Sequence, residues 1–137
     1  MSKTAVVYWS GTGNTEQMAQ AVAESAGAEL IPCANFDASK LDEFDAVAFG
    51  CPSMGAEQLE EDEFEPMFTA CSPKLSGKKI ALFGSYGWGD GEWMRTWKEQ
   101  CESLGAVLVA EPVICNETPD EEALEACRTL GQKLAQA

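Results

Sequence analysis

The sequence predicts an α/β fold in which a doubly wound parallel sheet is covered by helices on both faces. Continuous apolar runs rich in β-branched residues recur along the chain, as expected of strands that are buried on both faces. Segments with apolar residues at helical spacing separate these runs, and loops rich in glycine follow three of them. With 137 residues, the chain is expected to form a single domain, residues 1–137.

Two strands and one helix are predicted near the start of the chain. Residues 4–9, TAVVYW, form the first strand, and the helix after it has apolar residues at helical spacing: Met18, Ala21, Val22 and Ala26. Gly27 is placed to end this helix. Residues 28–33 form the second strand, and because Pro32 has no N–H to donate, we expect this strand at an edge of the sheet.

Three more strands complete a predicted five-stranded sheet. Residues 45–50 and 78–84 are strongly apolar and are expected to be central strands. The fifth strand, residues 106–115, is broken by Pro112.

One helix is predicted on each side of the fifth strand. The helix before it has Asp90 as its expected N-cap, Gly105 at its end and a buried face made of Trp93, Trp97, Cys101 and Leu104. The helix after it is predicted from a capping box, with Thr118 as the cap, Pro119 in the first helical position and Glu121 completing the box. Its buried stripe consists of Leu124, Cys127, Leu130 and Leu134.

The composition excludes several classes of function. The formal net charge is -14, from 23 acidic against 9 basic residues, and there is no cluster of Lys and Arg of the kind that binds nucleic acid. The chain has no histidine, which excludes Ser-His and Cys-His catalytic pairs and most zinc sites. No apolar run is long enough to cross a bilayer, and we expect a cytoplasmic protein without a secretion signal.

The six cysteines are predicted to be reduced residues of the core. They are too far apart in sequence for a CxxC motif of a redox, zinc or iron–sulfur site. Most of them lie inside apolar segments, where a free cysteine behaves as a small buried hydrophobic residue. The even number of cysteines would permit disulfides, but we expect reduced thiols and no metal site.

Three predicted strands are followed by loops of similar chemistry: residues 10–15, 51–55 and 85–91. All three loops are rich in glycine and small polar residues, and two of them also contain a large side chain, Met54 or Trp88. Ligands of open parallel sheets bind beyond the carboxyl ends of the strands, where the strand order reverses. The three loops are therefore expected to meet and form a binding site.

The first loop, SGTGNT, has the features of a phosphate cradle. Gly11 and Gly13 allow a tight turn, the following helix presents free N–H groups, and the hydroxyl and amide side chains add donors. It has no Walker lysine, and Glu16 replaces the third glycine of a dinucleotide fingerprint. An uncharged cradle suits a terminal phosphomonoester. The alternative is a simple glycine-rich turn in which Thr12 caps the helix.

The third loop favours a ligand with an aromatic ring. Glycines flank Trp88 on both sides, so its indole is free to offer a flat face at the surface. The alternative, an indole that anchors the core, suits Trp93 and Trp97 better because these two lie at helical spacing.

The motifs YWSGTGNT, GCPSMGAE and GSYGWGDGEW together resemble those of the short-chain flavodoxins of clostridia-like anaerobic bacteria, and the similarity covers essentially the whole chain. The resemblance implies a flavodoxin-like sheet with strand order 2-1-3-4-5. It also implies non-covalently bound FMN and low-potential, one-electron transfer between redox proteins, with the flavin shuttling between its neutral semiquinone and its hydroquinone.

The resemblance also assigns a role to each loop. The FMN phosphate would be wrapped by Ser10, Gly11, Thr12, Gly13, Asn14 and Thr15. The isoalloxazine would lie between Met54 on its inner face and Trp88 on its outer face. The ring and the ribityl chain would be lined by Ser53, Gly55, Glu57, Ser85, Tyr86, Gly87 and Gly89, with Pro52 and Ala56 in the same segment.

In the family, the peptide after the glycine at position 55 flips on reduction and accepts a hydrogen bond from flavin N5–H. Glu57 would accept a bond from the ring N3–H. Ala56 departs from many relatives, which have Asp, Ser or Gly there, and its β-carbon changes the cost of the flipped peptide. Carboxylates around the ring and the absence of basic residues in the loops would destabilise the reduced, anionic flavin, which then donates its electron readily.

The acidic run EQLEEDEFE, residues 57–65, has two interpretations. It is either a solvated helix start whose acids complement the helix dipole, or a docking face for basic redox partners. The two are compatible, and a monomer is expected.

Three other functions fit the sequence less well. An NAD(P)H-dependent FMN reductase would need cations near the flavin, and these loops have none. A signalling receiver would need paired acids after the first strand, where this chain has Trp9 and Ser10. A module that binds only phosphate leaves Trp88 without a role.

Overall fold

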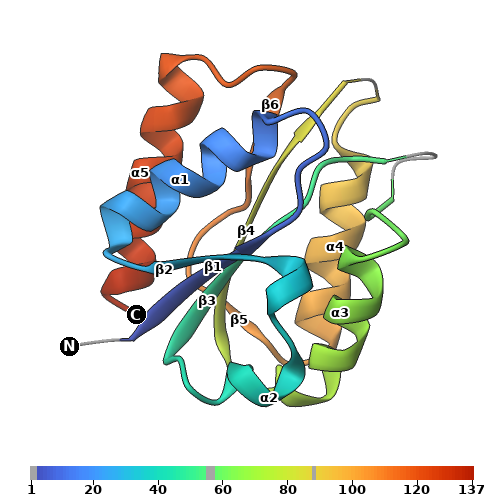
Figure 1. Cartoon of the computed structure of the whole chain (residues 1–137), viewed down its shortest axis with the longest axis vertical. Coiled ribbons are helices and arrows are strands. Elements are labelled where there is room, and N and C mark those ends of the chain that lie inside the picture. The colour runs from blue at the N-terminus through green and yellow to red at the C-terminus, as the bar shows by residue number, and fades with distance from the viewer. Residues whose placement is uncertain (1–2, 55–57, 88) are drawn as a thin grey trace.

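The computed structural model describes residues 3–54, 58–87 and 89–137. Its centre is a parallel sheet with strand order β2-β1-β3-β4-β5, and β6 also pairs with β4 (Figure 1). The strands are β1 (Thr4–Tyr8), β2 (Glu29–Pro32), β3 (Ala46–Gly50), β4 (Lys79–Tyr86), β5 (Val107–Leu108) and β6 (Val113–Asn116). The predicted strand order is confirmed, and so is the place of β2 at the edge.

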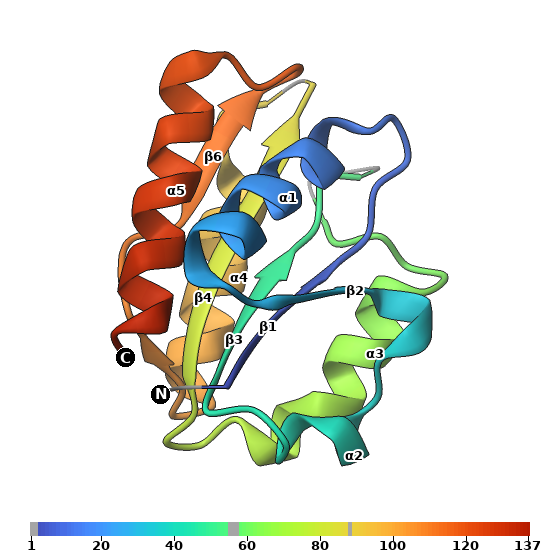
Figure 2. The ribbon, with the colours of Figure 1, turned by 60° about the vertical axis from the view of Figure 1, so that its left-hand side comes forward.

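Helices cover both faces of the sheet, as predicted. On one face lie α1 (Asn14–Ala26) and α5 (Glu121–Ala135), and on the other lie α2 (Ala38–Leu41), α3 (Phe64–Cys71) and α4 (Glu92–Ser103) (Figure 2). Short 3₁₀ turns occupy Cys33–Asn35 and Ser72–Lys74. Each face has its own apolar core, because side chains of successive strand residues alternate between the two faces.

The core between the sheet and α3/α4 is built largely from aromatic rings. Trp97 packs edge-on against Phe64 and Phe68, with ring centroids 5.5 Å apart in both pairs. Trp93 and Trp97 are 2% and 1% exposed, so their predicted role as core residues is confirmed. These edge-to-face contacts between large rings fix α3 and α4 against each other.

The predicted fifth strand is divided into β5 and β6. Both pair with β4, but at different places: β5 with residues 79–80 and β6 with residues 83–86. The interruption covers residues 109–112, which is wider than the break predicted at Pro112. The proline removes one donor, and the chain leaves the ladder over the residues before it.

Two predicted helix caps are wrong. The N-cap of α5 is Asp120, whose Oδ1 accepts from Ala123 N at 2.8 Å, and Thr118 lies outside the helix. The N-cap of α4 is Gly91 at φ 92°, whereas Asp90 forms an ion pair with Arg95 at 3.0 Å. In both places the true cap lies closer to the helix than the predicted one.

The six cysteines are free thiols in the structure, and all but the half-buried Cys115 are buried, as predicted. In the part of the chain that the structure describes, no helix is both long and apolar enough to span a membrane.

Candidate cofactor-binding site

The three glycine-rich loops meet in one pocket of about 630 Å³ at the carboxyl ends of the strands. The predicted site residues that line it are Ser10, Gly11, Thr12, Asn14, Thr15, Pro52, Ser53, Met54, Ser85, Tyr86 and Gly87. Gly13 and Gly89 belong to the same loops but are not among the lining residues. Gly55, Ala56, Glu57 and Trp88 lie outside the described residues, so the structure does not test their predicted contacts.

Ser10 shapes the first loop. Its Oγ accepts hydrogen bonds from Gly13 N at 3.0 Å and from Glu16 N at 3.3 Å. Gly13 has φ 95° and is the N-cap of α1, so the cap is not Thr12. With this turn, the loop wraps the amino end of a helix of 13 residues, where unpaired N–H groups and the helix dipole favour an anion.

Ser85, near the end of β4, connects the other loops to one another. Its backbone N–H donates to Thr15 Oγ1 at 3.4 Å, and its carbonyl accepts from Ser53 N at 3.0 Å. Its hydroxyl donates to the carbonyl of Glu117 at 2.6 Å. A buried residue of an interior strand thus fixes the loops that follow β1, β3 and β6 in one arrangement.

The loop after β3 lies close to the backbone of β4. A β-carbon on Gly84 would come within 2.2 Å of the carbonyl oxygen of Cys51, so only glycine fits there. The same carbonyl accepts from Trp93 Nε1 at 3.2 Å. Farther along, Met54 and Gln58 form an isolated antiparallel bridge, with N–H···O distances of 2.8 and 2.9 Å.

The hydrogen-bond donors of the pocket fit a cofactor that has a phosphate group and an uncharged ring, such as FMN. Ser53 lines the pocket, and its Oγ is buried without a hydrogen-bond partner among the residues that the structure describes. A buried hydroxyl without a partner is costly, and a polar ligand group in the pocket would satisfy it. The cradle of Ser10, Thr12 and Asn14 provides the neutral donors that a phosphate needs.

Three lining residues were not predicted: Trp9, Glu117 and Thr118. Glu117 and Thr118 directly follow β6, so the rule that ligands lie beyond strand ends could have found them. Glu117 adopts φ 57°, rare for a residue other than glycine, and its N–H donates to the carbonyl of Tyr86 at 2.7 Å. Among the described lining residues, Glu117 is the only charged one.

Trp9 links the first loop to the acidic segment that precedes α3, residues 58–63. Its indole lies against Gly11, where a β-carbon would come within 2.9 Å of the ring, and its Nε1 donates to Glu63 Oε1 at 3.3 Å. The continuous apolar run made Trp9 look like a strand residue, so its place in the pocket wall was not predicted.

The acidic segment is not uniformly solvated. Glu61, Asp62 and Glu63 are exposed, but Glu60 is only 5% exposed. Its carboxylate accepts from the N–H groups of Asp62, Glu63 and Phe64, each at 2.8 Å. Burial raises the pKa of Glu60, but these bonds outweigh it and leave the pKa below its ordinary value. The interpretation as a solvated helix start is therefore wrong for this residue.

Comparison with known proteins gives consistent matches over nearly the whole chain. The family model described as Flavodoxin matches residues 6–131. The chain is 46% identical over 138 residues to a flavodoxin of Megasphaera elsdenii, covering 96% of this chain and 98% of that one. It is 47% identical over 135 residues to a flavodoxin of Clostridium beijerinckii, covering 95% and 97%.

Solved structures agree with these matches. A solution structure of two-electron reduced flavodoxin from Megasphaera elsdenii superposes with a TM-score of 0.89 at 42% identity, covering 98% of this chain and 99% of that one. A crystal structure of oxidised Flavodoxin 1 from Bacillus cereus gives a TM-score of 0.85 at 28% identity, covering 98% and 97%.

Proposed function

The chain belongs to the flavodoxin family, and on that premise we propose that this FMN-binding electron carrier passes single electrons between the neutral semiquinone and the hydroquinone of its flavin. Members of the family are electron-transfer proteins rather than enzymes. The observation that supports the proposed couple is the charge of the pocket. Among the lining residues that the structure describes there is no Lys or Arg, and the one charged side chain is a glutamate.

The physical reason is electrostatic. A fully reduced flavin tends to be anionic, and an anion is destabilised in a partly desolvated pocket that has a carboxylate and no basic side chain. The second electron is then hard to add and easy to give away. A carrier built in this way is a strong reductant.

The cofactor is proposed to bind across the three loops. The phosphate would lie in the cradle of residues 10–15 at the amino end of α1, and Ser53, Ser85 and Tyr86 would line the ribityl chain and the ring. Met54 lines the pocket and would cover the inner face of the ring. The proposed roles of Trp88 on the outer face, of Gly55 in the peptide flip and of Glu57 at N3–H concern residues outside the described ranges.

Trp88→Ala tests the proposed stacking. Loss of an aromatic face that stacks on the ring should weaken FMN binding by about tenfold, since such contacts contribute about 0.5–1.5 kcal/mol beyond area burial. It should also raise the potential of the second reduction step, because water then reaches the reduced ring. Fluorescence titration of FMN and a spectroelectrochemical titration measure the two effects. If both stay unchanged, Trp88 does not stack on the flavin.

The decisive experiment is an anaerobic reduction of the purified protein that is monitored by absorption spectroscopy. The protein should be yellow, and stepwise addition of dithionite should first produce the blue neutral semiquinone and then bleach it. NAD(P)H alone should have no effect until a reductase is added, because the protein is a carrier. A direct two-electron bleach would count against the proposed couple.

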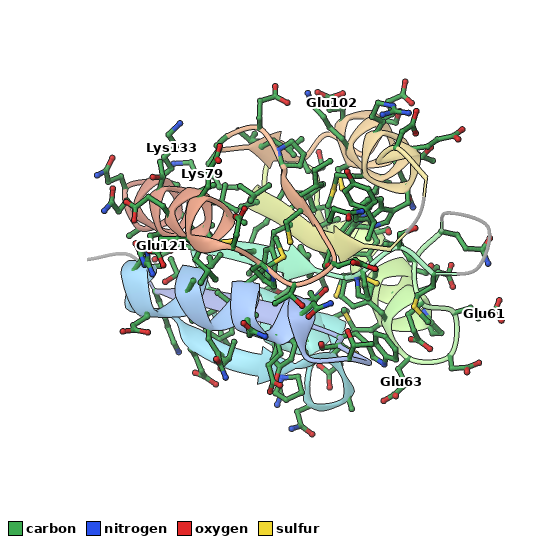
Figure 3. The ribbon with its side chains drawn as sticks, turned by 90° about the horizontal axis from the view of Figure 1, so that it is seen from above. Glu61, Glu63, Lys79, Glu102, Glu121 and Lys133 are labelled. Carbon is green, nitrogen blue, oxygen red and sulfur yellow. The ribbon has the colours of Figure 1, made fainter. Side chains whose placement is uncertain are left out.

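We further propose that basic redox proteins dock near the flavin, on exposed acids of residues 61–63, and that the carrier works as a monomer. The side chains of Glu61 and Glu63 project outward from the segment before α3 (Figure 3). Complementary charge mainly raises the rate of encounter. Light scattering of the FMN-loaded protein should give one chain of 14.7 kDa per particle, and a dimer mass would contradict the monomer.

A further inference from the structure

The loop after β4, residues 87–91, has the sequence GWGDG. Gly89 and Gly91 have φ of 86° and 92°, a region that residues with a side chain rarely adopt. Glycine has more backbone conformations open to it than any other residue, so three glycines among five residues give this loop little preference for one shape. Contacts with the rest of the protein therefore decide how the loop is held.

The loop begins at a fixed point. Tyr86, the last residue of β4, accepts at its carbonyl from Glu117 N at 2.7 Å and from Asn116 Nδ2 at 3.3 Å. Its ring packs against Trp93 of α4, with ring centroids 5.5 Å apart, and Trp93 is buried. Tyr86 and Gly87 both line the cofactor pocket. The start of the loop is thus tied to the core at the point where it enters the pocket wall.

Arg95 of α4 holds the other end of the loop. Its Nη1 donates to the carbonyl of Asp90 at 3.0 Å, and its Nη2 donates to Asp90 Oδ1, also at 3.0 Å. One planar guanidinium therefore fixes both the main chain and the side chain of a residue that lies between two glycines. The next residue, Gly91, lies close to β6, because a β-carbon on it would come within 3.0 Å of Ile114 Cδ1.

Neither helix formation nor stability explains an arginine at this position. Arg95 lies near the amino end of α4, where the helix dipole opposes a positive charge. The side chains of Arg95 and Asp90 are 59% and 78% exposed, and an ion pair so exposed contributes little to the stability of a fold. The contact is therefore expected to act on the loop rather than on the fold as a whole.

We propose that Arg95 is a positioning residue for the flavin. It holds Asp90 and so keeps the loop of residues 87–91 in the shape that binds the isoalloxazine, and the loop then loses less conformational entropy when FMN binds. Arg95 is not among the lining residues of the pocket, so it acts through the loop and not by contact with the cofactor. This inference rests on the proposed function, in which Trp88 of the same loop covers the outer face of the ring.

Binding of riboflavin and of FMN by Arg95→Ala, Asp90→Ala and the double variant tests the proposal. Dilution of the protein loaded with either flavin, followed by the recovery of flavin fluorescence, gives the dissociation constants. Arg95→Ala should raise both constants about threefold, because the loop contacts the ring that the two flavins share. Asp90→Ala should raise them less, since the bond to the backbone carbonyl remains, and the double variant should equal Arg95→Ala.

Riboflavin separates this role of Arg95 from a simple attraction of charges. Arg95→Ala removes a positive charge and Asp90→Ala a negative one, so an effect of charge alone would act on anionic FMN with opposite signs and would leave uncharged riboflavin unaffected. Loss of the contact instead weakens the binding of riboflavin in both variants. Riboflavin binding that Arg95→Ala leaves unchanged, or a double variant whose loss is the product of the two single losses, would overturn the proposal.

The matched control is Arg128→Ala, which removes an arginine with ion pairs to Glu121 and Glu125 on α5, outside the pocket. It should leave both dissociation constants unchanged. Arg95→Ala should also leave the urea midpoint of the flavin-free protein unchanged, and a fall larger than that of Arg128→Ala would mean a purely structural role and would overturn the proposal. Failure of the proposed stacking is seen separately, as unchanged flavin binding in Trp88→Ala, and failure of the proposed couple in the absorption of the flavin during reduction.

Discussion

Glu60 has a different role from the exposed acids that follow it in the sequence. Its carboxylate is buried and accepts three backbone N–H groups at the start of α3, where a helix has no partners of its own for those donors. It acts as a cap placed four residues before the first helical residue. The segment that faces the proposed partner is thus shaped by one buried acid.

Glu60→Gln should destabilise the fold. An amide can accept on one side only, so its NH₂ group would face a backbone N–H that now has no acceptor. Charge-assisted bonds contribute about 1.5–3 kcal/mol, and we expect a loss of that size in the free energy of unfolding, measured by urea denaturation. Glu61→Gln, an exposed neighbour, should change it by less than about 0.5 kcal/mol. Equal stability of the two variants would contradict this role.

The same carboxylate makes stability depend on pH. The pKa of Glu60 is lower in the folded protein than in the unfolded chain, so its stabilisation is complete above the unfolded value of about 4.3. It is lost as the pH falls through that value and the folded pKa. Urea titrations from pH 7 to pH 3 should show the difference between wild type and Glu60→Gln becoming smaller as the pH falls. A difference independent of pH would mean that the charge does not matter.

At the scale of the elements, the start of α5 separates two candidate caps. Asp120 caps the helix through Ala123 N, whereas Thr118 lies in the preceding loop. Asp120→Ala should therefore lower the free energy of unfolding by about 1 kcal/mol, and Thr118→Ala should leave it nearly unchanged. Urea denaturation in the absence of added FMN makes the comparison, because Thr118 lines the cofactor pocket. If Thr118→Ala lowered the free energy of unfolding more than Asp120→Ala, the cap would be Thr118, as the sequence had predicted.

The contact between α1 and α5 depends on one glycine. A β-carbon on Gly131 would come within 2.5 Å of the carbonyl oxygen of Val22 and 3.0 Å of Ser25 Cβ. Gly131→Ala should thus destabilise the protein by about 1–3 kcal/mol, although alanine forms helices better than glycine does. Thermal unfolding followed by circular dichroism measures the change. Thr129→Ala, on the exposed side of the same helix, is the control and should be neutral or slightly stabilising.

The strands and the long helices could be predicted because each has a strong local pattern. The apolar runs of β1, β3 and β4 and the stripe of α5 that includes Cys127, Leu130 and Leu134 lie in the structure as expected. The short α2 has too few residues to show a helical period, so neither this helix nor its N-cap, Asp37, was predicted. The predicted N-caps of α4 and α5 were wrong because several residues that can cap a helix precede each of them. Which of these residues becomes the cap depends on the tertiary fold.

The site was predicted from the chemistry of the loops, but not all of its residues could be identified from the sequence. Ser10, Ser53 and Ser85 follow or end apolar strands, so their place in the pocket wall follows from the topology alone. Glu117 was missed because the division of the last strand obscured where that strand ends. The burial of Glu60 could not be found, since nothing in an acidic run distinguishes the one residue that turns inward.

At the scale of the whole molecule, the charge of -14 should govern the rate of electron transfer. Attraction to a basic protein is screened by salt, so the second-order rate constant with a basic acceptor protein should fall at least about tenfold between about 0.01 M and 0.3 M ionic strength. Stopped-flow absorption measures this rate. An uncharged quinone as the acceptor is the control and should show almost no dependence. A flat salt profile with the basic acceptor would contradict electrostatic guidance.

The six thiols have a practical consequence. Burial raises the pKa of each of them, to about 12 for Cys33, Cys101 and Cys127, so almost no thiolate is present near neutral pH. A cysteine introduced at an exposed position such as Ser103 would then react with maleimide far faster than the native ones. A single fluorescent dye could then be attached without removing any of the native cysteines, and energy transfer from it to an acceptor protein that contains haem would report how that protein approaches.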